Sequence, residues 1–68
     1  MSTQEKMVAA RGYLLQLAEE ELNAHNALLA GIGSQYDLDM ASAKLNAVID
    51  MLELLDVDVS ELLCRREG

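Results

Sequence analysis

The sequence predicts an all-α protein: a long helical hairpin followed by a short C-terminal helix, dimerising into an antiparallel assembly that resembles a four-helix bundle. Proline is absent, the only aromatic residues are two tyrosines, and Ala, Leu, Glu and Met dominate. These are the residues of helices rather than sheets. Apolar residues recur at a helical period on either side of one glycine-containing segment. A chain of 68 residues is one domain, 1–68, and is near the size where a lone core is marginal.

The first helix is expected over residues 4–30. Its apolar residues stand seven apart, at Val8, Leu15, Leu22 and Leu29. Ser2 or Thr3 is expected to cap it, with Thr3 favoured. The opposite face should meet water and carries Gln16, Glu19, Glu20, Asn23 and Asn26.

Three polar residues intrude at the margin of this apolar face: Arg11, Glu21 and His25. Glu21 precedes His25 by four residues, close enough on a helix for a hydrogen bond or an ion pair. One interpretation is a polar pair at the edge of the core that fixes the helix register. The other is a pH-sensitive or catalytic pair, which would lack a nucleophile or third group nearby in sequence.

A loop is expected over residues 31–37. Gly31 suits a left-handed residue just past a helix end, with Ile32 covering the last turn. Asp37 is the expected cap of the second helix. The Gly-x-Gly pattern here does not indicate a phosphate site, because no strand precedes it and no Lys follows it.

The second helix is expected over residues 38–55, and its apolar surface organises the chain. The predicted dimer core consists of Leu45, Val48, Ile49, Leu52 and Leu55. Further apolar residues widen this stripe: Met40, Ala47, Met51 and Leu54. One packed neighbour covers an arc of about 100° of a helix, and this stripe is wider. The sequence therefore predicts a homodimer.

Residues 56–58 are expected to break the helix, followed by a third helix over residues 59–66. Asp58 and Glu61 have the spacing of a capping box. A continuous helix remains an alternative, because the apolar phase does not slip across this segment. Cys64 is interpreted as a small filler residue, since no activating partner lies near it in sequence.

Charge restricts the function. Twelve carboxylates against five Lys and Arg residues give a net charge of −7. This disfavours direct binding to nucleic acid or an anionic membrane and favours a partner protein with a basic surface. The candidate partner-binding residues are Tyr13, Glu19, Glu20, Gln35, Tyr36, Asp50 and Glu53.

Chemistry is limited by the side chains available. One Cys and one His exclude an intrachain disulfide and a structural zinc site. No catalytic set, cofactor site, secretory signal or membrane-spanning run is evident. The sequence therefore predicts a cytoplasmic, non-enzymatic interaction protein.

In size, acidity and hairpin layout, the whole chain resembles small phage-encoded helical-hairpin inhibitors, including the quorum-sensing anti-activator. The resemblance implies a protein that binds and inhibits or adapts another, possibly the DNA-binding domain of a transcription regulator. Thr3–Lys6 resembles the opening of plasmid copy-number RNA-binding hairpins. The run from Ser42 to Ile49 is similar to the Ser-x-x-Leu-Asp core of small sporulation phosphatases, with Asn46 in place of the Asp. RNA binding and phosphatase activity are therefore the alternatives.

Overall fold

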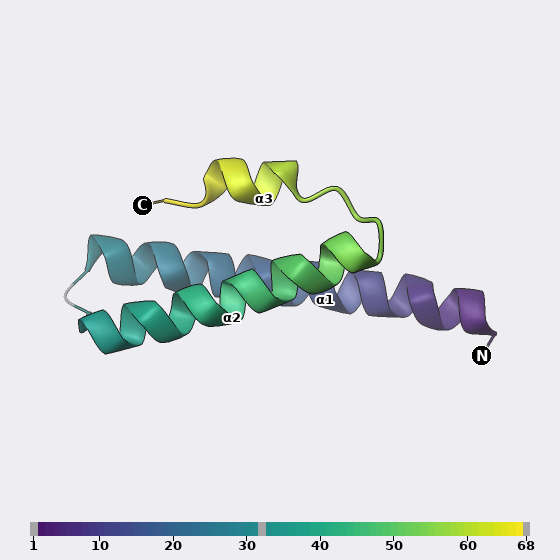
Figure 1. Cartoon of the computed structure of the whole chain (residues 1–68), viewed down its shortest axis with the longest axis horizontal. Helices are drawn as coiled ribbons and strands as arrows, with labels where there is room; N and C mark the ends of the chain where they lie inside the picture. Colours follow the sequence, from purple (N-terminus) through teal and green to yellow (C-terminus); the bar gives the residue numbers. More distant parts are fainter. Residues whose placement is uncertain (1, 32, 68) are drawn as a thin grey trace.

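The protein is described by a computed structural model that covers residues 2–31 and 33–67. Within these ranges it contains three helices, α1 (Thr3–Ala30), α2 (Gln35–Leu54) and α3 (Ser60–Arg65), and no strand. Helices α1 and α2 form an antiparallel hairpin, and α3 returns along it (Figure 1). The all-α prediction is confirmed. In the same ranges no helix has the length and apolar character needed to cross a membrane.

Serine hydroxyls start both long helices. Ser2 accepts the Glu5 N–H at 3.2 Å, while the Glu5 side chain accepts the Ser2 N–H at 3.4 Å, which completes a capping box. Ser34 accepts the Asp37 N–H at 3.1 Å. The predicted caps Thr3 and Asp37 are therefore wrong. In each case a serine stands three residues before a carboxylate, which places the acid inside the positive first turn.

The connection between α1 and α2 is shorter than predicted, because α2 begins at Gln35 rather than at residue 38. Gly31 donates its N–H to the Ala27 carbonyl at 2.9 Å. Its φ of −104° and ψ of −161° are extended, so the predicted left-handed conformation is wrong. The expected role of Ile32 lies outside the described residues.

Helix α2 ends in a reversal of the chain. Asp56 has a φ of 59°, in the left-handed region that Asp tolerates better than most residues. The Val57 N–H donates to the Leu52 carbonyl and the Asp56 N–H to the Glu53 carbonyl, both at 3.0 Å. This pair of bonds is a Schellman motif. The predicted break at 56–58 is confirmed.

Helix α3 begins one residue later than predicted. Val59 is its N-cap and makes no side-chain cap bond, so the proposed Asp58–Glu61 capping box does not form. Asp58 instead accepts the Ser60 N–H at 2.9 Å and the Ser60 hydroxyl at 2.7 Å. These bonds lower the pKa of the Asp58 carboxyl. Asp58 therefore orders the turn that leads into α3.

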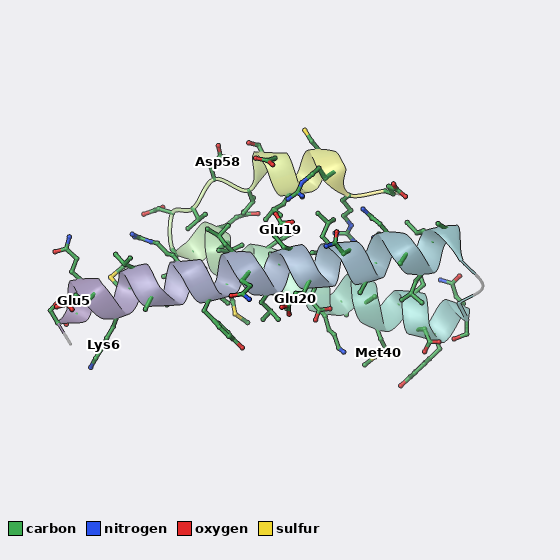
Figure 2. The ribbon with its side chains drawn as sticks, turned by 180° about the vertical axis from the view of Figure 1, so that it is seen from behind. Glu5, Lys6, Glu19, Glu20, Met40 and Asp58 are labelled. Carbon is green, nitrogen blue, oxygen red and sulfur yellow. The ribbon has the colours of Figure 1, made fainter. Side chains whose placement is uncertain are left out.

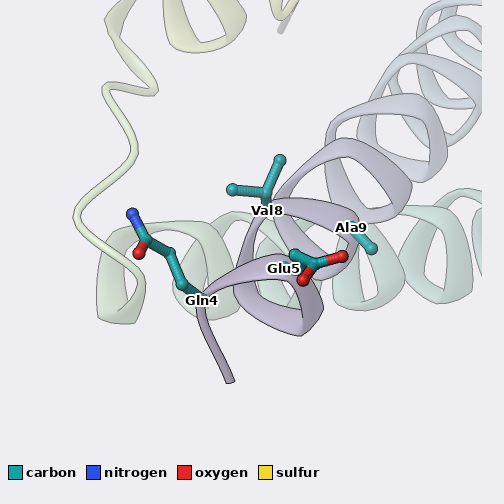
Figure 3. Close-up of a pocket in the computed structure, with 4 residues that line it drawn as sticks. All are labelled: Gln4, Glu5, Val8 and Ala9. Carbon is teal, nitrogen blue, oxygen red and sulfur yellow. The ribbon is translucent and has the colours of Figure 1, made fainter. Parts of the chain in front are cut away.

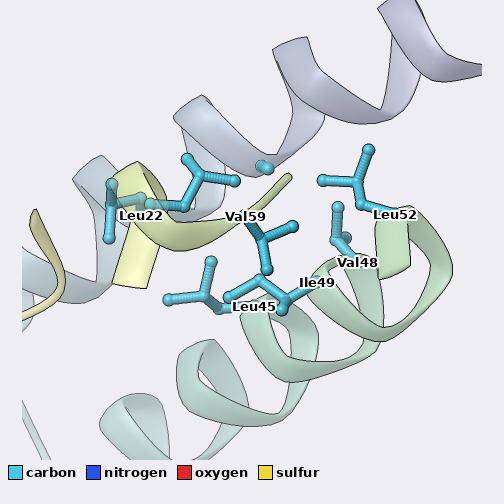
Figure 4. Close-up of a cluster of buried hydrophobic side chains, with 8 residues drawn as sticks. Leu22, Leu45, Val48, Ile49, Leu52 and Val59 are labelled. Carbon is cyan, nitrogen blue, oxygen red and sulfur yellow. The ribbon is translucent and has the colours of Figure 1, made fainter. Parts of the chain in front are cut away.

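The core lies where α3 covers the hairpin (Figure 4). Its buried apolar side chains are Ala18 and Leu22 of α1, Leu45, Val48, Ile49 and Leu52 of α2, and Val59 and Leu62. Leu45 and Leu52 are completely buried and Leu22 is 1% exposed. The same chain therefore closes the core from three sides.

This arrangement corrects the predicted dimer core. Four of its residues, Leu45, Val48, Ile49 and Leu52, are buried inside one chain, and Leu55 is half-buried. The reason is the turn at 56–58, which folds Val59 and Leu62 back over α2 instead of extending its stripe. The cover that seemed to require a second chain comes mainly from α1, and Val59 and Leu62 complete it.

The buried line on α1 also differs from the predicted one. It runs through Ala18, Leu22 and His25, whereas Val8 and Leu15 are exposed. Helix α1 is eight residues longer than α2, so its first two turns project about 12 Å beyond the end of α2 (Figure 1). His25 is the one buried polar side chain among the described residues, at 4% exposed.

Substitutions at two nearby leucines of α2 should distinguish its buried face from its exposed face by their effects on stability. Leu52→Ala removes a fully buried side chain and should lower the free energy of unfolding by about 2–5 kcal/mol. Leu54→Ala, at a side chain that is 84% exposed, should change it by less than about 0.5 kcal/mol. Urea unfolding followed by circular dichroism measures both. Equal losses would contradict the assignment of the inner and outer faces.

Candidate functional site

Glu19, predicted to contact a partner, is instead used within the chain. Arg65 of α3 donates through Nη1 to Glu19 Oε2 at 3.0 Å and through Nη2 to Oε1. Figure 2 shows Glu19 on the side of α1 that faces α3. The guanidinium lowers the pKa of Glu19, chiefly by hydrogen bonding, and Glu19 raises the pKa of Arg65 in return. Glu19 therefore anchors α3.

Two asparagines complete this anchor. Asn26 Nδ2 donates to the Arg65 carbonyl at 3.0 Å, and Asn26 Oδ1 accepts the Glu67 N–H at 3.0 Å. The same oxygen lies 3.0 Å from His25 Nδ1, so that nitrogen is the donor. His25 therefore bonds to Asn26 rather than to Glu21. On α2, Asn46 accepts a hydrogen bond from Arg66.

All three arginines have acceptors inside the chain. Arg65 pairs with Glu19 and lies 3.8 Å from Glu61, Arg66 donates to Asn46, and Arg11 Nε donates to the Leu55 carbonyl at 3.2 Å. The Arg11 bond places a cation at the negative C-terminal end of α2. These bonds fix the positions of three of the five cationic side chains, and the net charge remains −7.

The other predicted partner-binding residues are exposed and are divided between α1 and α2. Tyr13 and Glu20 stand seven residues apart on α1, and Asp50 and Glu53 three apart on α2. Tyr13 is 66% exposed. Gln35 and Tyr36 begin α2 rather than lying in a loop, and Gln35 Nε2 donates to Asp39 Oδ1 at 2.8 Å.

The outer face of α2 carries a continuous apolar line that sequence analysis had merged with the core stripe. We call it the α2 ridge, and its residues are Tyr36, Met40, Ala43, Ala47, Met51 and Leu54. All six are exposed, from 44% at Met40 to 84% at Leu54 among the four large side chains. Their spacing averages 3.6 residues, which keeps them on one side of the helix. The same spacing is present in the sequence and could have identified the α2 ridge there.

A second surface feature is an open, shallow hollow on the first two turns of α1 (Figure 3). It is lined by Gln4, Glu5, Val8 and Ala9, all from one helix. The described residues contain no group of three or more His, Cys, Asp or Glu side chains placed to hold a metal ion. The exposed features of α1 and α2 are therefore apolar and acidic surfaces that another molecule could contact.

Comparisons with protein-family models, curated proteins and solved structures found no match to this chain. Its function is therefore inferred from its own surface.

Acid should release α3 before it unfolds the hairpin. Glu19 and Asp58 both have lowered pKa values in the folded chain. The stability that these two carboxylates contribute to the fold is present at pH values above their ordinary pKa values of 4.5 and 3.8. It is lost as the pH falls through their lowered pKa values in the folded chain. Amide protection factors of residues 60–65 should therefore fall between about pH 5 and pH 3, ahead of those in α2.

The control is the double variant Glu19→Gln with Asp58→Asn. It should show weaker protection of α3 at neutral pH and little further change on acidification. If the variant keeps the acid-dependent loss of the original chain, these two carboxyls are not its cause.

Proposed function

We propose that this chain is a non-enzymatic protein that binds another protein and inhibits or adapts it. The observation that carries the proposal is which charged side chains are bonded within the chain and which are exposed. Three of the five cationic side chains are held by acceptors within the chain, whereas Glu20, Asp50 and Glu53 are exposed. Such a surface attracts a basic partner and orients it during encounter.

The partner class follows from the same charge distribution. Proteins that bind nucleic acid present clustered Lys and Arg to phosphates. An acidic helical surface can occupy those groups and so compete with DNA or RNA. A transcription regulator, approached at its DNA-binding surface, is the partner that we propose. This action is stoichiometric, with one blocked partner for each binding surface.

We also propose that the protein is a homodimer. Its support is the small core of a 68-residue chain together with apolar side chains on the projecting part of α1. Val8 is 60% exposed and Met7 is 39% exposed. A second copy packing antiparallel along these turns would cover them.

Sedimentation equilibrium should return a mass of about 15 kDa, twice the 7.5 kDa of one chain. Val8→Glu should give a monomer with unchanged helical circular dichroism, because it places an uncompensated charge in the proposed interface. Ala24→Glu, at another exposed position of α1, is the matched control and should remain dimeric. A folded monomer for the unsubstituted chain at micromolar concentration contradicts the proposal.

Neutralising Glu20, Asp50 and Glu53 together to Gln should slow association with the partner at least about tenfold and flatten its salt dependence. The reason is that exposed charges are screened beyond about 8 Å at physiological ionic strength. Stopped-flow or surface-plasmon measurements with a partner isolated from the native host provide the rates. The control, Gln16→Glu, adds charge to the same exposed surface of α1 and should not slow association.

Two results would contradict the proposed function. One is binding that is indifferent both to salt and to the triple substitution. The other is an effect on the partner at far below one equivalent of this protein, which would indicate turnover.

A further inference from the structure

The α2 ridge is a continuous apolar line that the fold leaves uncovered. It spans residues 36–54, which is five turns at 3.6 residues per turn, and every position on the line is apolar. Leu54 is 84% and Tyr36 71% exposed. Single exposed apolar residues are common on protein surfaces, but a contiguous row of them marks an interaction site.

The side-chain sizes along the α2 ridge fit a helix. Ala43 and Ala47 form its middle, where a second backbone can approach to the 8–10 Å typical of packed helices. Met40 and Met51 flank them and, being unbranched, adapt to the surface that they meet. Tyr36 and Leu54 lie at the two ends, where their larger side chains can contact the ends of a bound helix. The α2 ridge therefore has small side chains in its middle and large ones at its ends.

The borders of the α2 ridge indicate the charge of the occupant. At 100° per residue, Asp39 and Asp50 fall on one border, and Asp37 and Lys44 on the other. Three of these four side chains are carboxylates, and Glu53 lies farther out on the same side as Asp50. Among residues 2–31 and 33–67, none of these carboxylates is in an ion pair. Arg66 is held at Asn46, farther out than Asp39 and Asp50 on the same side, so the charges next to the α2 ridge on that border are carboxylates. That border is therefore suited to Lys and Arg.

A second copy of this chain fits these borders poorly. Antiparallel two-fold pairing about residue 45 would bring Lys44 beside the Lys44 of the other copy and Asp39 opposite its Asp50. This arrangement places like charges together next to an apolar seam, which disfavours association.

We propose that the α2 ridge is the docking site for one amphipathic α-helix of another protein, whose apolar stripe is bordered by Lys and Arg. This inference rests on the proposed function and names the structural element through which the partner is held. It combines the helix-in-groove mode of recognition with charge pairing at the rim. The proposed homodimer uses the projecting turns of α1 and leaves the α2 ridge free.

The test uses a synthetic helical peptide as the probe, as long as the 20 residues of α2. It carries Leu and Ala along one stripe and Lys and Arg at the borders, and a matched peptide has Glu at each border position. Calorimetric titration into the full chain should show 1:1 binding per chain by the basic peptide. The acidic peptide should bind at least about tenfold more weakly.

Two alanines provide the matched protein variants. Ala47→Glu places a carboxylate in the middle of the α2 ridge and should weaken binding of the basic peptide at least about tenfold, although it adds a favourable net charge. Ala24→Glu adds the same charge to an exposed position on α1 and should change the affinity by less than about twofold. Amide shifts on titration should concentrate in residues 36–54.

Four outcomes overturn the inference. The first is no binding of the basic peptide, and the second is equal affinity for the unsubstituted chain and Ala47→Glu. The third is a dimer that Ala47→Glu alone dissociates, which would make a second copy the occupant. If the native partner binds Ala47→Glu normally but still requires Glu20, Asp50 and Glu53, the α2 ridge is excluded while the proposed function stands.

Discussion

Asp56 reverses the chain at the end of α2, with a φ of 59°, and this reversal decides which faces of α2 meet protein and which meet water. It directs Val59 and Leu62 back onto the hairpin, where they complete the burial of Leu45. Had the helix continued, the inner stripe would have needed a second molecule. Because it turns, one chain closes its own core and leaves the outer face of α2 uncovered.

Helix α3 has six residues, too few to be stable alone, so its position depends on what it contacts. Burial of Leu62 provides the apolar part of the contact between α3 and the hairpin. The polar part comes from Glu19, Asn26 and Asn46, which receive Arg65, Arg66 and the backbone beyond them. These contacts also fix the positions of two of the five cationic side chains. The contacts that hold α3 therefore also determine where these positive charges lie on the surface.

Composition and helical period were sufficient to predict the hairpin. The break at 56–58 and the third helix were predicted from the spacing of Asp58 and Glu61, although the capping box that this spacing suggested does not form. They also identified Leu45, Val48, Ile49 and Leu52 as buried. Periodicity indicates how much apolar surface must be buried but does not identify the element that buries it. The burial of these residues was therefore attributed to an interface with a second chain. Glu19 was expected in solvent because its partner, Arg65, lies 46 residues away in sequence. The α2 ridge was missed because Met40, Met51 and Leu54 were counted with one broad stripe.

The central claim is that α3 closes the core within its own chain and leaves the outer face of α2 free. An isotope-filtered nuclear Overhauser experiment on an equal mixture of ¹³C-methyl-labelled and unlabelled protein tests it directly. Contacts between the methyls of Leu45 and Leu62 should appear as intrachain signals and be absent from the interchain spectrum. Interchain contacts between these methyls would show that α3 packs on a second molecule, and would contradict the account.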